Sequence, residues 1–422
     1  MRFLPPLAAV AACLALPLAA TSAMSRPVSA PAATPDKARA PVTILISIDG
    51  FRADYLDRGE TPVLSRLAAG GVHAAMRPSF PSVTFPNHWT LVTGLVPDHN
   101  GIVGNKMKDP ARPDETFDMK SDDPFWWNQA APIWRDAELA GLRSATVFWP
   151  GSNVAWGGTR EDKKVTGGTR PEDWLEYNKA VTGPQRINTV LDWMRRPAAI
   201  RPRLVTLYFD QVDSAGHDFG PDAPETRTAM QEVDRSIGEL VAGLAALGQK
   251  ANLVIVADHG MAATAPERVV WLKDIADPAD FTLVEDGTFA AIAPVPGHEA
   301  ALEAALAKPH DHLQCWPKAK IPARFRYGTN PRVEPWLCLA DVGWLVFDKP
   351  PHKVKGGNHG YDNAAPEMAA LFIANGPAFR AAGKLPAFDN VDVAPLLRDL
   401  LKLPPAKDAD GDDQPFRAVL KR

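Results

Sequence analysis

Cysteine is scarce in this chain, with three among 422 residues. So few thiols exclude a scaffold held by many disulfides and a metal site built from cysteine alone. The excess of one charge sign over the other is also small, because the formal net charge is only −4. The chain therefore lacks the basic balance typical of proteins that bind a nucleic-acid polymer or an anionic membrane. A small anionic substrate would need locally placed cations or metal ions.

Long apolar runs are absent after the first residues. Arg2 is followed by an apolar run over 3–20 and then by small residues, a pattern typical of a secretory signal peptide. Three prolines interrupt the run, which does not suit a membrane anchor. A lipoprotein-type box ends at Cys13, but the apolar run continues past it, which disfavours lipid anchoring there. We predict a signal peptide over 1–23, a disordered leader over 24–40, and an exported, periplasmic or secreted protein without a transmembrane segment.

Removal of the signal peptide would leave Cys315 and Cys338 as the remaining cysteines. In an oxidising compartment such a pair most simply forms one disulfide. Two buried thiols are the alternative. We therefore predict a disulfide and keep the thiol form open.

Three β-rich runs each end in an acidic residue. They cover 43–48, 204–209 and 252–257, and are followed by Asp49, by Asp210 and Asp213, and by Asp258 and His259. Nearly continuous apolar runs are typical of strands covered on both faces. Helical stripes over 187–194, 230–244 and 391–403 lie between and after them. Strands that alternate with helices predict an α/β fold with a doubly wound, mostly parallel sheet, whose ligands bind at the carboxyl ends of the strands.

The pattern changes between 264 and 350. Short strands are predicted at 281–284, 290–293, 324–327 and 342–347, around one helix at 297–307. We interpret this segment as a smaller α+β insertion or cap that holds the cysteine pair. The catalytic domain is then expected over 41–263 and 351–405. An acidic run at 408–413 lacks the distal glutamate of a calcium loop, so 406–422 is expected to be a solvated tail.

Oxygen and nitrogen ligands gather where the predicted strands meet glycine-containing loops. Carboxylates mixed with imidazoles suit Zn²⁺. One Asp-His pair is most often a surface or capping pair, but several such groups at strand ends indicate a metal centre. The candidate ligands are Asp49, Asp213, His217, Asp258, His259 and His359.

A proline-braced loop over 78–88 contains the candidate nucleophile, Thr84. A threonine at the start of a helix is usually a plain cap. A hydroxyl bound to Zn²⁺ would instead have a lowered pKa and be held as a nucleophile. The sequence around Thr84 allows both interpretations.

These residues occur in an ordered set that resembles the nucleotide pyrophosphatase/phosphodiesterase family of the alkaline phosphatase superfamily. The resemblance covers about residues 41–400 and is specific because the motifs follow the family order. One departure is visible, since the family usually has His-Gly-Ile before Asn105, whereas Asn100 opens that motif here. The matching motifs are IDGFR at 48–52, TFPNH at 84–88, TGL at 93–95, GIVGN at 101–105, FWPG at 148–151, DSAGHDFGP at 213–221, DHGM at 258–261 and NHG at 358–360.

The resemblance implies two Zn²⁺ ions and an alkaline-phosphatase-like fold. Asp213, His217 and His359 would hold one zinc, and Asp49, Asp258 and His259 the other. Thr84 would bridge to the second zinc as the nucleophile. Asn105, together with the backbone N–H near Thr84, would stabilise a phosphoryl oxygen.

The same resemblance implies a hydrolase that forms a phosphothreonine intermediate and releases a nucleoside 5′-monophosphate. Two metals about 4 Å apart can stabilise the attacking and leaving oxygens of an in-line displacement. Phe85 follows the nucleophile, and Trp174 stands where the family commonly has tyrosine. Aromatic residues at these two places clamp a nucleobase in the family, so a small nucleotide is the expected substrate.

Other functions stay open from the sequence. A phospholipase C-like enzyme of the same family would cleave choline or glycerol phosphodiesters, but neither an apolar tunnel nor an anionic cage is clear. A monoesterase would need more cationic groups than Arg52 in the motifs. A sulfatase would have Cys or Ser in place of Thr84. A secreted metal-binding protein without activity is the alternative from another class, and a missing ligand would favour it.

Overall fold

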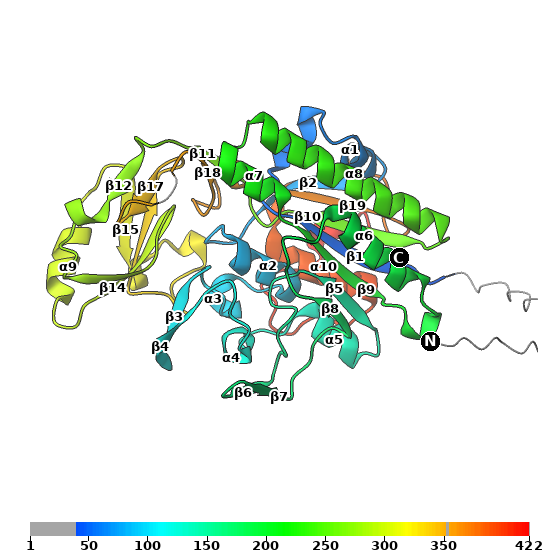
Figure 1. The fold of residues 1–422 in the computed structure, drawn as a ribbon, viewed down its shortest axis with the longest axis horizontal. Helices are drawn as coiled ribbons and strands as arrows, with labels where there is room; N and C mark the ends of the chain where they lie inside the picture. The colour runs from blue at the N-terminus through cyan, green and yellow to red at the C-terminus, as the bar shows by residue number, and fades with distance from the viewer. Residues whose placement is uncertain (1–38, 352–353, 422) are drawn as a thin grey trace, which may run out of the picture. The chain divides into compact units, whose positions relative to one another are not determined.

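A nine-stranded mixed sheet lies at the centre of the described residues 39–351 and 354–421 of the computed structural model (Figure 1). Its strand order is β20-β2-β19-β10-β1-β9-β5-β8, and β21 also pairs with β2. The predicted signal peptide over 1–23 and most of the leader over 24–40 lie outside the described residues. The strands are β20 (Gly383–Lys384), β2 (Val72–Arg77), β19 (Ala370–Asn375), β10 (Ala251–Val256), β1 (Val42–Ile48), β9 (Leu204–Phe209), β5 (Ser144–Val147), β8 (Asp173–Leu175) and β21 (Phe388–Asp389).

The three predicted strands are the adjacent central strands β10, β1 and β9. β1 runs parallel to both neighbours, and all seven of its residues are buried. β9 is buried along its whole length too, because helices cover both faces of the sheet. Antiparallel pairing begins only at β19, which pairs with β10 and β2. The predicted α/β class with a mostly parallel sheet is confirmed.

Two groups of helices cover the sheet (Figure 1). One group contains α1 (Pro62–Ala69), α6 (Gly183–Arg195), α7 (Gln211–Phe219) and the long helix α8 (Pro224–Ala246), which contacts the other three. The second group contains α2 (Thr84–Thr93), α5 (Ile133–Leu139) and α10 (Val393–Leu401), in mutual contact. The predicted apolar stripes fall on α6, α8 and α10. Shorter elements here are α3 (Pro97–Asn100), α4 (Pro124–Trp127), β3 (Met107–Asp109), β4 (Arg112–Phe117), β6 (Thr159–Glu161) and β7 (Lys164–Thr166).

Small sheets occupy the segment between β11 (Ala262–Thr264) and β18 (Gly356–Asn358), which pair with each other. A four-stranded antiparallel sheet has the order β13-β14-β16-β15, and a short pair joins β12 to β17 (yellow-green to orange in Figure 1). These elements have their own buried apolar cluster, which includes residues of α9. Their bounds are β12 (Val269–Trp271), β13 (Phe281–Glu285), β14 (Phe289–Pro294), α9 (Glu299–Leu306), β15 (Leu313–Pro317), β16 (Trp336–Ala340) and β17 (Leu345–Phe347).

The predicted disulfide is confirmed. Cys315 on β15 and Cys338 on β16 are direct partners in the antiparallel register and are bonded to each other. The strand predicted over 324–327 is wrong. Ala323–Phe325 is a short 3-10 helix, and Arg326 after it has a positive φ of 49° that ends any extended run.

The last residues pack against the main body of the chain, unlike the solvated tail expected for them. Phe416 has 0% exposure, and its ring packs against those of Phe372 and Phe388 of the central sheet. Asp410 accepts a hydrogen bond from the Val96 N–H at 2.8 Å and pairs with Arg326 at 2.7 Å. The acidic run is thus partly neutralised by contacts that the local composition does not reveal.

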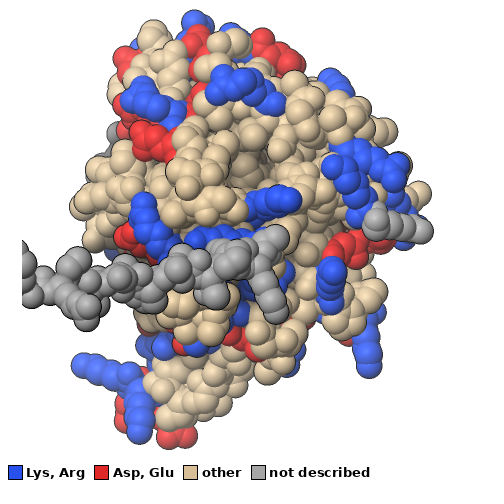
Figure 2. Space-filling model, turned by 90° about the vertical axis from the view of Figure 1, so that its right-hand side faces the viewer, with Lys and Arg blue, Asp and Glu red and all other residues tan. Residues whose placement is uncertain are grey.

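Charged side chains are scattered over the face shown in Figure 2. Lys and Arg form separate groups there, with uncharged surface between them. Within the described part of the chain, no helix combines the length and the apolarity needed to cross a membrane.

Truncation of a β1 side chain should destabilise the protein far more than the same change on the surface. Ile46 is fully buried, whereas Ile200 is exposed. We expect Ile46→Ala to lower the free energy of unfolding by about 2–5 kcal/mol, because it leaves a cavity in the core. Ile200→Ala should change it by less than about 0.5 kcal/mol. Urea unfolding of both variants measures this, and equal losses would contradict the assignment of β1 to the core.

Candidate metal centre and active-site cavity

The acidic residues converge because their strands are parallel neighbours. Asp49 follows β1, and Asp258 and His259 follow β10, while α7 after β9 carries Asp213. The chain turns sharply after Asp49, where Gly50 has a φ of 67°. A Cβ at Gly50 would lie 3.0 Å from the Cα of Asp213, so glycine allows α7 to approach β1.

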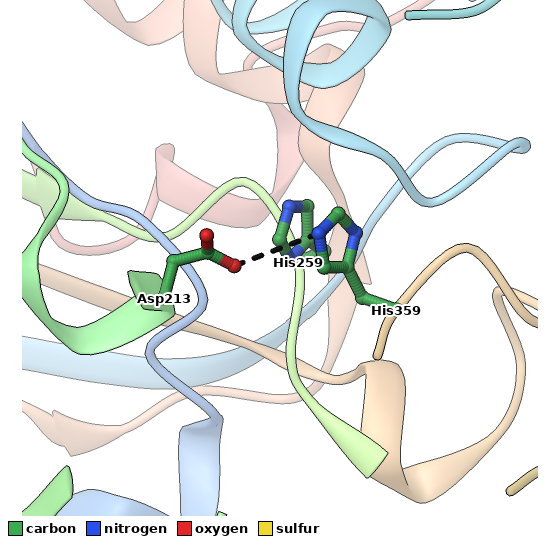
Figure 3. A group of neighbouring side chains, drawn as sticks. All are labelled: Asp213, His259 and His359. Atoms are coloured by element: carbon green, nitrogen blue, oxygen red, sulfur yellow. Dashed lines mark ion pairs between the residues drawn. The ribbon is translucent and has the colours of Figure 1, made fainter. Parts of the chain in front are cut away.

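Three side chains from two distant segments form a first cluster. The Nε2 atoms of His217 and His359 lie 3.1 Å apart, and each lies 3.5 Å from Oδ1 of Asp213. Figure 3 shows the Asp213 carboxylate pointing from α7 toward His359, with His259 in the same group. This arrangement places two ring nitrogens and one carboxylate oxygen around a common point.

The backbone determines which ring nitrogens can act as ligands. Nδ1 of His217 lies 2.9 Å from the Gly357 carbonyl oxygen, and Nδ1 of His359 lies 3.2 Å from that of Ser82. A carbonyl oxygen only accepts, so each Nδ1 carries the hydrogen and each neutral ring presents a bare Nε2. Two lone pairs that face each other at 3.1 Å repel unless a cation lies between them. The same pattern is typical of metal-binding histidines.

A second cluster centres on His259. Its Nδ1 lies 2.9 Å from the Gly260 carbonyl oxygen, so its Nε2 faces inward. This Nε2 lies 2.9 Å from Oδ2 of Asp258, 3.4 Å from Oδ1 of Asp49 and 3.2 Å from Oγ1 of Thr84. The rings of His259 and His359 stack at 3.5 Å, so the two clusters adjoin.

Each carboxylate in the centre keeps one buried oxygen without a hydrogen-bond partner among the described residues. These atoms are Oδ1 of Asp49, Oδ1 of Asp213 and Oδ2 of Asp258. Buried polar atoms are rarely left in this state, and a metal ion satisfies them. The donor set of carboxylates and neutral imidazoles therefore fits metal cations at two adjoining sites.

Like charges are crowded here. Burial, together with the negative charges of Asp258 and Asp213, raises the pKa of Asp49 well above its usual value. Burial and the neighbouring His259 and His217 hold the pKa of His359 well below its usual value. Tyr208 also donates a hydrogen bond of 2.6 Å to the other oxygen of Asp49. A cation in the centre would favour the charged carboxylates and the neutral imidazoles at once.

His88 is a neighbour of the centre that the sequence analysis missed. It forms a compact group with Asp49 and Asp258, but both of its nitrogens have protein partners. Nε2 lies 2.8 Å from Oγ of Ser47, and Nδ1 lies 2.9 Å from the Thr84 carbonyl oxygen. The four-residue spacing between Thr84 and His88, which share one helix face, is the signal that could have indicated it.

Thr84 is the first residue of α2 and follows the N-cap residue Val83. Its hydroxyl faces His259. The N–H of Phe85 donates to Oδ1 of Asn105 at 2.9 Å, so this N–H is already occupied by a side chain. Asn100, which stands where the family usually has histidine, is buried. Its side-chain NH₂ group donates a hydrogen bond of 2.9 Å to the Leu95 carbonyl oxygen.

A cavity of about 680 Å³ opens over the centre. Trp174 does not line it: the side chain is 38% exposed on the edge strand β8, and the Arg170 guanidinium lies 5.3 Å from its ring. A larger hollow of about 1120 Å³ beside α5 and α10 contains none of the candidate ligands. Residues that line the cavity over the centre include Asp49, Thr84, Phe85, Asn105, Met119, Lys120, Leu175, Tyr177, Asp213, His217 and His359.

Comparisons with known proteins agree with this arrangement. Residues 43–362 match the family model described as type I phosphodiesterase / nucleotide pyrophosphatase. The bis(5′-adenosyl)-triphosphatase enpp4 of Xenopus laevis is 36% identical over 367 residues, which are 86% of this chain and 78% of that protein. Ectonucleotide pyrophosphatase/phosphodiesterase family member 3 of Bos taurus is 36% identical over 390 residues, 87% of this chain and 42% of that longer protein.

A solved structure is similar over most of the chain. Murine ectonucleotide pyrophosphatase/phosphodiesterase 5, as an inactive variant in complex with AMP, has a TM-score of 0.84 and 34% identity, covering 90% of this chain and 100% of that one. Fold and sequence thus define a hydrolase of the alkaline phosphatase superfamily. The chain belongs to its type I phosphodiesterase/nucleotide pyrophosphatase family.

Loss of the His359 imidazole should remove one metal ion. We expect the purified wild type to retain two equivalents of divalent metal and His359→Ala to retain about one, because the two clusters use different donors. His99→Ala is the matched control, since His99 is exposed and pairs with Asp410. Elemental analysis after dialysis measures the stoichiometry. Two equivalents in His359→Ala would contradict the assignment.

Proposed function

We propose that this hydrolase is a two-zinc enzyme that cleaves nucleotide phosphodiester or pyrophosphate bonds and releases a nucleoside 5′-monophosphate. The observation that carries the proposal is the position of Thr84. Its hydroxyl lies 3.2 Å from Nε2 of His259, beside two buried carboxylates and on the wall of the cavity. A hydroxyl that serves only as a helix cap would bond to the helix backbone instead.

The spacing of the donor atoms supports zinc. In tetrahedral zinc sites with bonds of about 2.0–2.1 Å, ligand atoms lie about 3.3 Å apart. The separations in the first cluster are 3.1 and 3.5 Å. Those around His259 are 2.9, 3.2 and 3.4 Å. We assign Asp213, His217 and His359 to one ion, and Asp49, Asp258, His259 and Thr84 to the other.

Bound zinc supplies a lowered hydroxyl pKa and charge that stabilises phosphoryl oxygens. In the proposed reaction, Oγ1 of Thr84 gives its proton to water and attacks phosphorus, while the bond to the leaving oxygen breaks and that oxygen departs with the electron pair. The phosphothreonine ester is then cleaved by water, which returns the threonine hydroxyl and releases the monophosphate. Asn105 acts as a hydrogen-bond donor to a phosphoryl oxygen, since its Oδ1 is occupied by the Phe85 N–H.

A nucleotide is the substrate that the cavity suits best. Phe85 lines the cavity next to Thr84. Leu175 and Tyr177 line the cavity as well, and the exposed Trp174 directly precedes Leu175 in the chain. We propose that Phe85 and Trp174 stack on the nucleobase, with Trp174 turning inward when substrate binds. The bound AMP of the murine relative supports a nucleoside monophosphate product. Stacking on aromatic faces contributes about 1–3 kcal/mol per base.

We propose that the protein is exported to the periplasm or secreted. The disulfide between Cys315 and Cys338 supports an oxidising compartment, and the relatives named as ectonucleotide enzymes support an extracytoplasmic site of action. This agrees with the signal peptide expected over 1–23.

The substrate class is tested with three chromogenic esters: a nucleoside 5′-monophosphate aryl diester, an aryl phosphocholine and an aryl monophosphate. We expect the zinc-loaded wild type to prefer the nucleotide diester by kcat/KM. Thr84→Ala should lose at least about a thousandfold in kcat, because the nucleophile is gone. Thr84→Ser, which keeps a hydroxyl, should retain measurable turnover, and Thr93→Ala at the other end of α2 should resemble wild type.

Preference for the phosphocholine ester would contradict the nucleotide assignment and identify choline phosphodiesters as the substrate class. Full turnover by Thr84→Ala would remove Thr84 as the nucleophile. No turnover of any ester by zinc-loaded wild type would leave a metal-binding protein without this activity.

A further inference from the structure

A buried carboxyl group from the small sheets reaches the active-site segment. Glu285 is the last residue of β13 and is 9% exposed. Its Oε1 accepts a hydrogen bond of 3.2 Å from the N–H of Asn105, and the N–H of Lys106 also faces the carboxyl group. Gly104 is packed against it, since a Cβ there would lie 2.4 Å from Oε2. The backbone on both sides of the Asn105 peptide is thus held by one side chain.

The contact continues from Asn105 to the candidate nucleophile. Oδ1 of Asn105 accepts from the N–H of Phe85, the residue that follows Thr84. An amide has one acceptor oxygen, so this bond orients the Asn105 side chain and leaves its NH₂ group as the part that can donate toward the cavity. Hydrogen bonds therefore link Glu285 to Asn105 and Asn105 to the start of α2.

Other contacts hold the flanks of the same segment, but at a distance from Asn105. The Tyr327 hydroxyl donates to the Val103 carbonyl oxygen at 2.8 Å. Arg332 donates to the Gly101 carbonyl oxygen at 2.7 Å and pairs with Asp109 at 2.6 Å. These groups all come from the segment between β11 and β18. Glu285 is the member that bonds to the Asn105 backbone itself.

We propose that Glu285 is a positioning residue for phosphoryl transfer, which acts by holding Asn105 where its amide donates to a phosphoryl oxygen. The inference rests on the proposed function of Asn105. The small sheets would then affect the reaction rate through Glu285. A shift of about 1 Å in a positioned group can reduce the rate about a hundredfold.

The protonation state of Glu285 determines which substitutions are informative. Burial raises the pKa of Glu285 to about 8, against the lowering effect of the two backbone hydrogen bonds and the Lys106 charge. The side chain is therefore mostly protonated at neutral pH, and glutamine resembles it in shape, charge and acceptor oxygen. Leucine has a similar size but no acceptor. Glu285→Gln should restore what Glu285→Leu removes.

The test is a double-mutant cycle between Glu285→Leu and Asn105→Ala in the zinc-loaded, full-length protein. We expect Glu285→Leu to lower kcat for the nucleotide diester about ten- to a hundredfold, with KM changed less than about threefold, because the contact is made to a group that acts in the transition state. Glu285→Gln should stay within about threefold of wild type. In the Asn105→Ala background, Glu285→Leu should have no further effect.

A matched control separates positioning from general damage to the small sheets. Glu334 is a half-buried glutamate of the same segment, and Glu334→Leu should leave kcat near the wild-type value. If Glu285→Leu does not fold, Glu285→Ala takes its place in the cycle. Multiplicative losses in the double variant, or a loss in Glu285→Gln equal to that in Glu285→Leu, would overturn the proposal.

The dissociation constant of orthovanadate, an analogue of the phosphoryl-transfer transition state, gives a second readout of the same cycle that needs no turnover. Calorimetry should show the same non-additivity in it, because an analogue of the transition state registers the contacts made there. A wild type that binds vanadate but hydrolyses no diester would refute the proposed function, while the cycle in vanadate affinity would still decide for or against positioning by Glu285.

Discussion

The arrangement of this molecule depends on a group of buried carboxylates and imidazoles that satisfy one another poorly. Asp49, Asp213 and Asp258 each keep a buried oxygen without a hydrogen-bond partner among the described residues. Two imidazole nitrogens face each other at 3.1 Å, and in neutral rings their backbone contacts leave both without a hydrogen. Such a cluster is costly in a folded protein unless cations bind to it. The parallel strands, the sharp turn at Gly50 and the backbone carbonyls behind each histidine all serve to hold this cluster together.

The segment between β11 and β18 supports the loop that carries Asn105. Glu285, Tyr327 and Arg332 of that segment form hydrogen bonds or ion pairs with residues 101–109. The disulfide joins β15 to β16, the two strands that flank the connection carrying Tyr327 and Arg332, in the sheet that also contains Glu285 on β13. The cavity is lined both by residues at the ends of the central strands, such as Asp49, and by Asn105. The loop that carries Asn105 is held in place by the segment between β11 and β18.

Much of the fold was predictable because the buried parallel strands have a strong local signal. The runs before Asp49 and Asp258 are apolar throughout, and strand ends of a parallel sheet must meet at one edge. The predicted disulfide followed from the presence of two remaining cysteines. Where contacts between residues distant in sequence determine the structure, the sequence-based predictions were wrong or could not be made. Arg326 adopts a left-handed conformation instead of a strand, and the tail is held by Phe416 in the core. The role of Glu285 depends on a single contact across 180 residues, which no local pattern reveals.

This centre should hold two metal ions at separate donor sets. Anomalous diffraction at the zinc absorption edge, from crystals of the zinc-loaded protein, tests this directly. We predict two peaks, one between Asp213, His217 and His359 and the other between Asp49, Asp258 and His259 beside the Thr84 hydroxyl. A single peak, or peaks bound elsewhere with these side chains left bare, would contradict it.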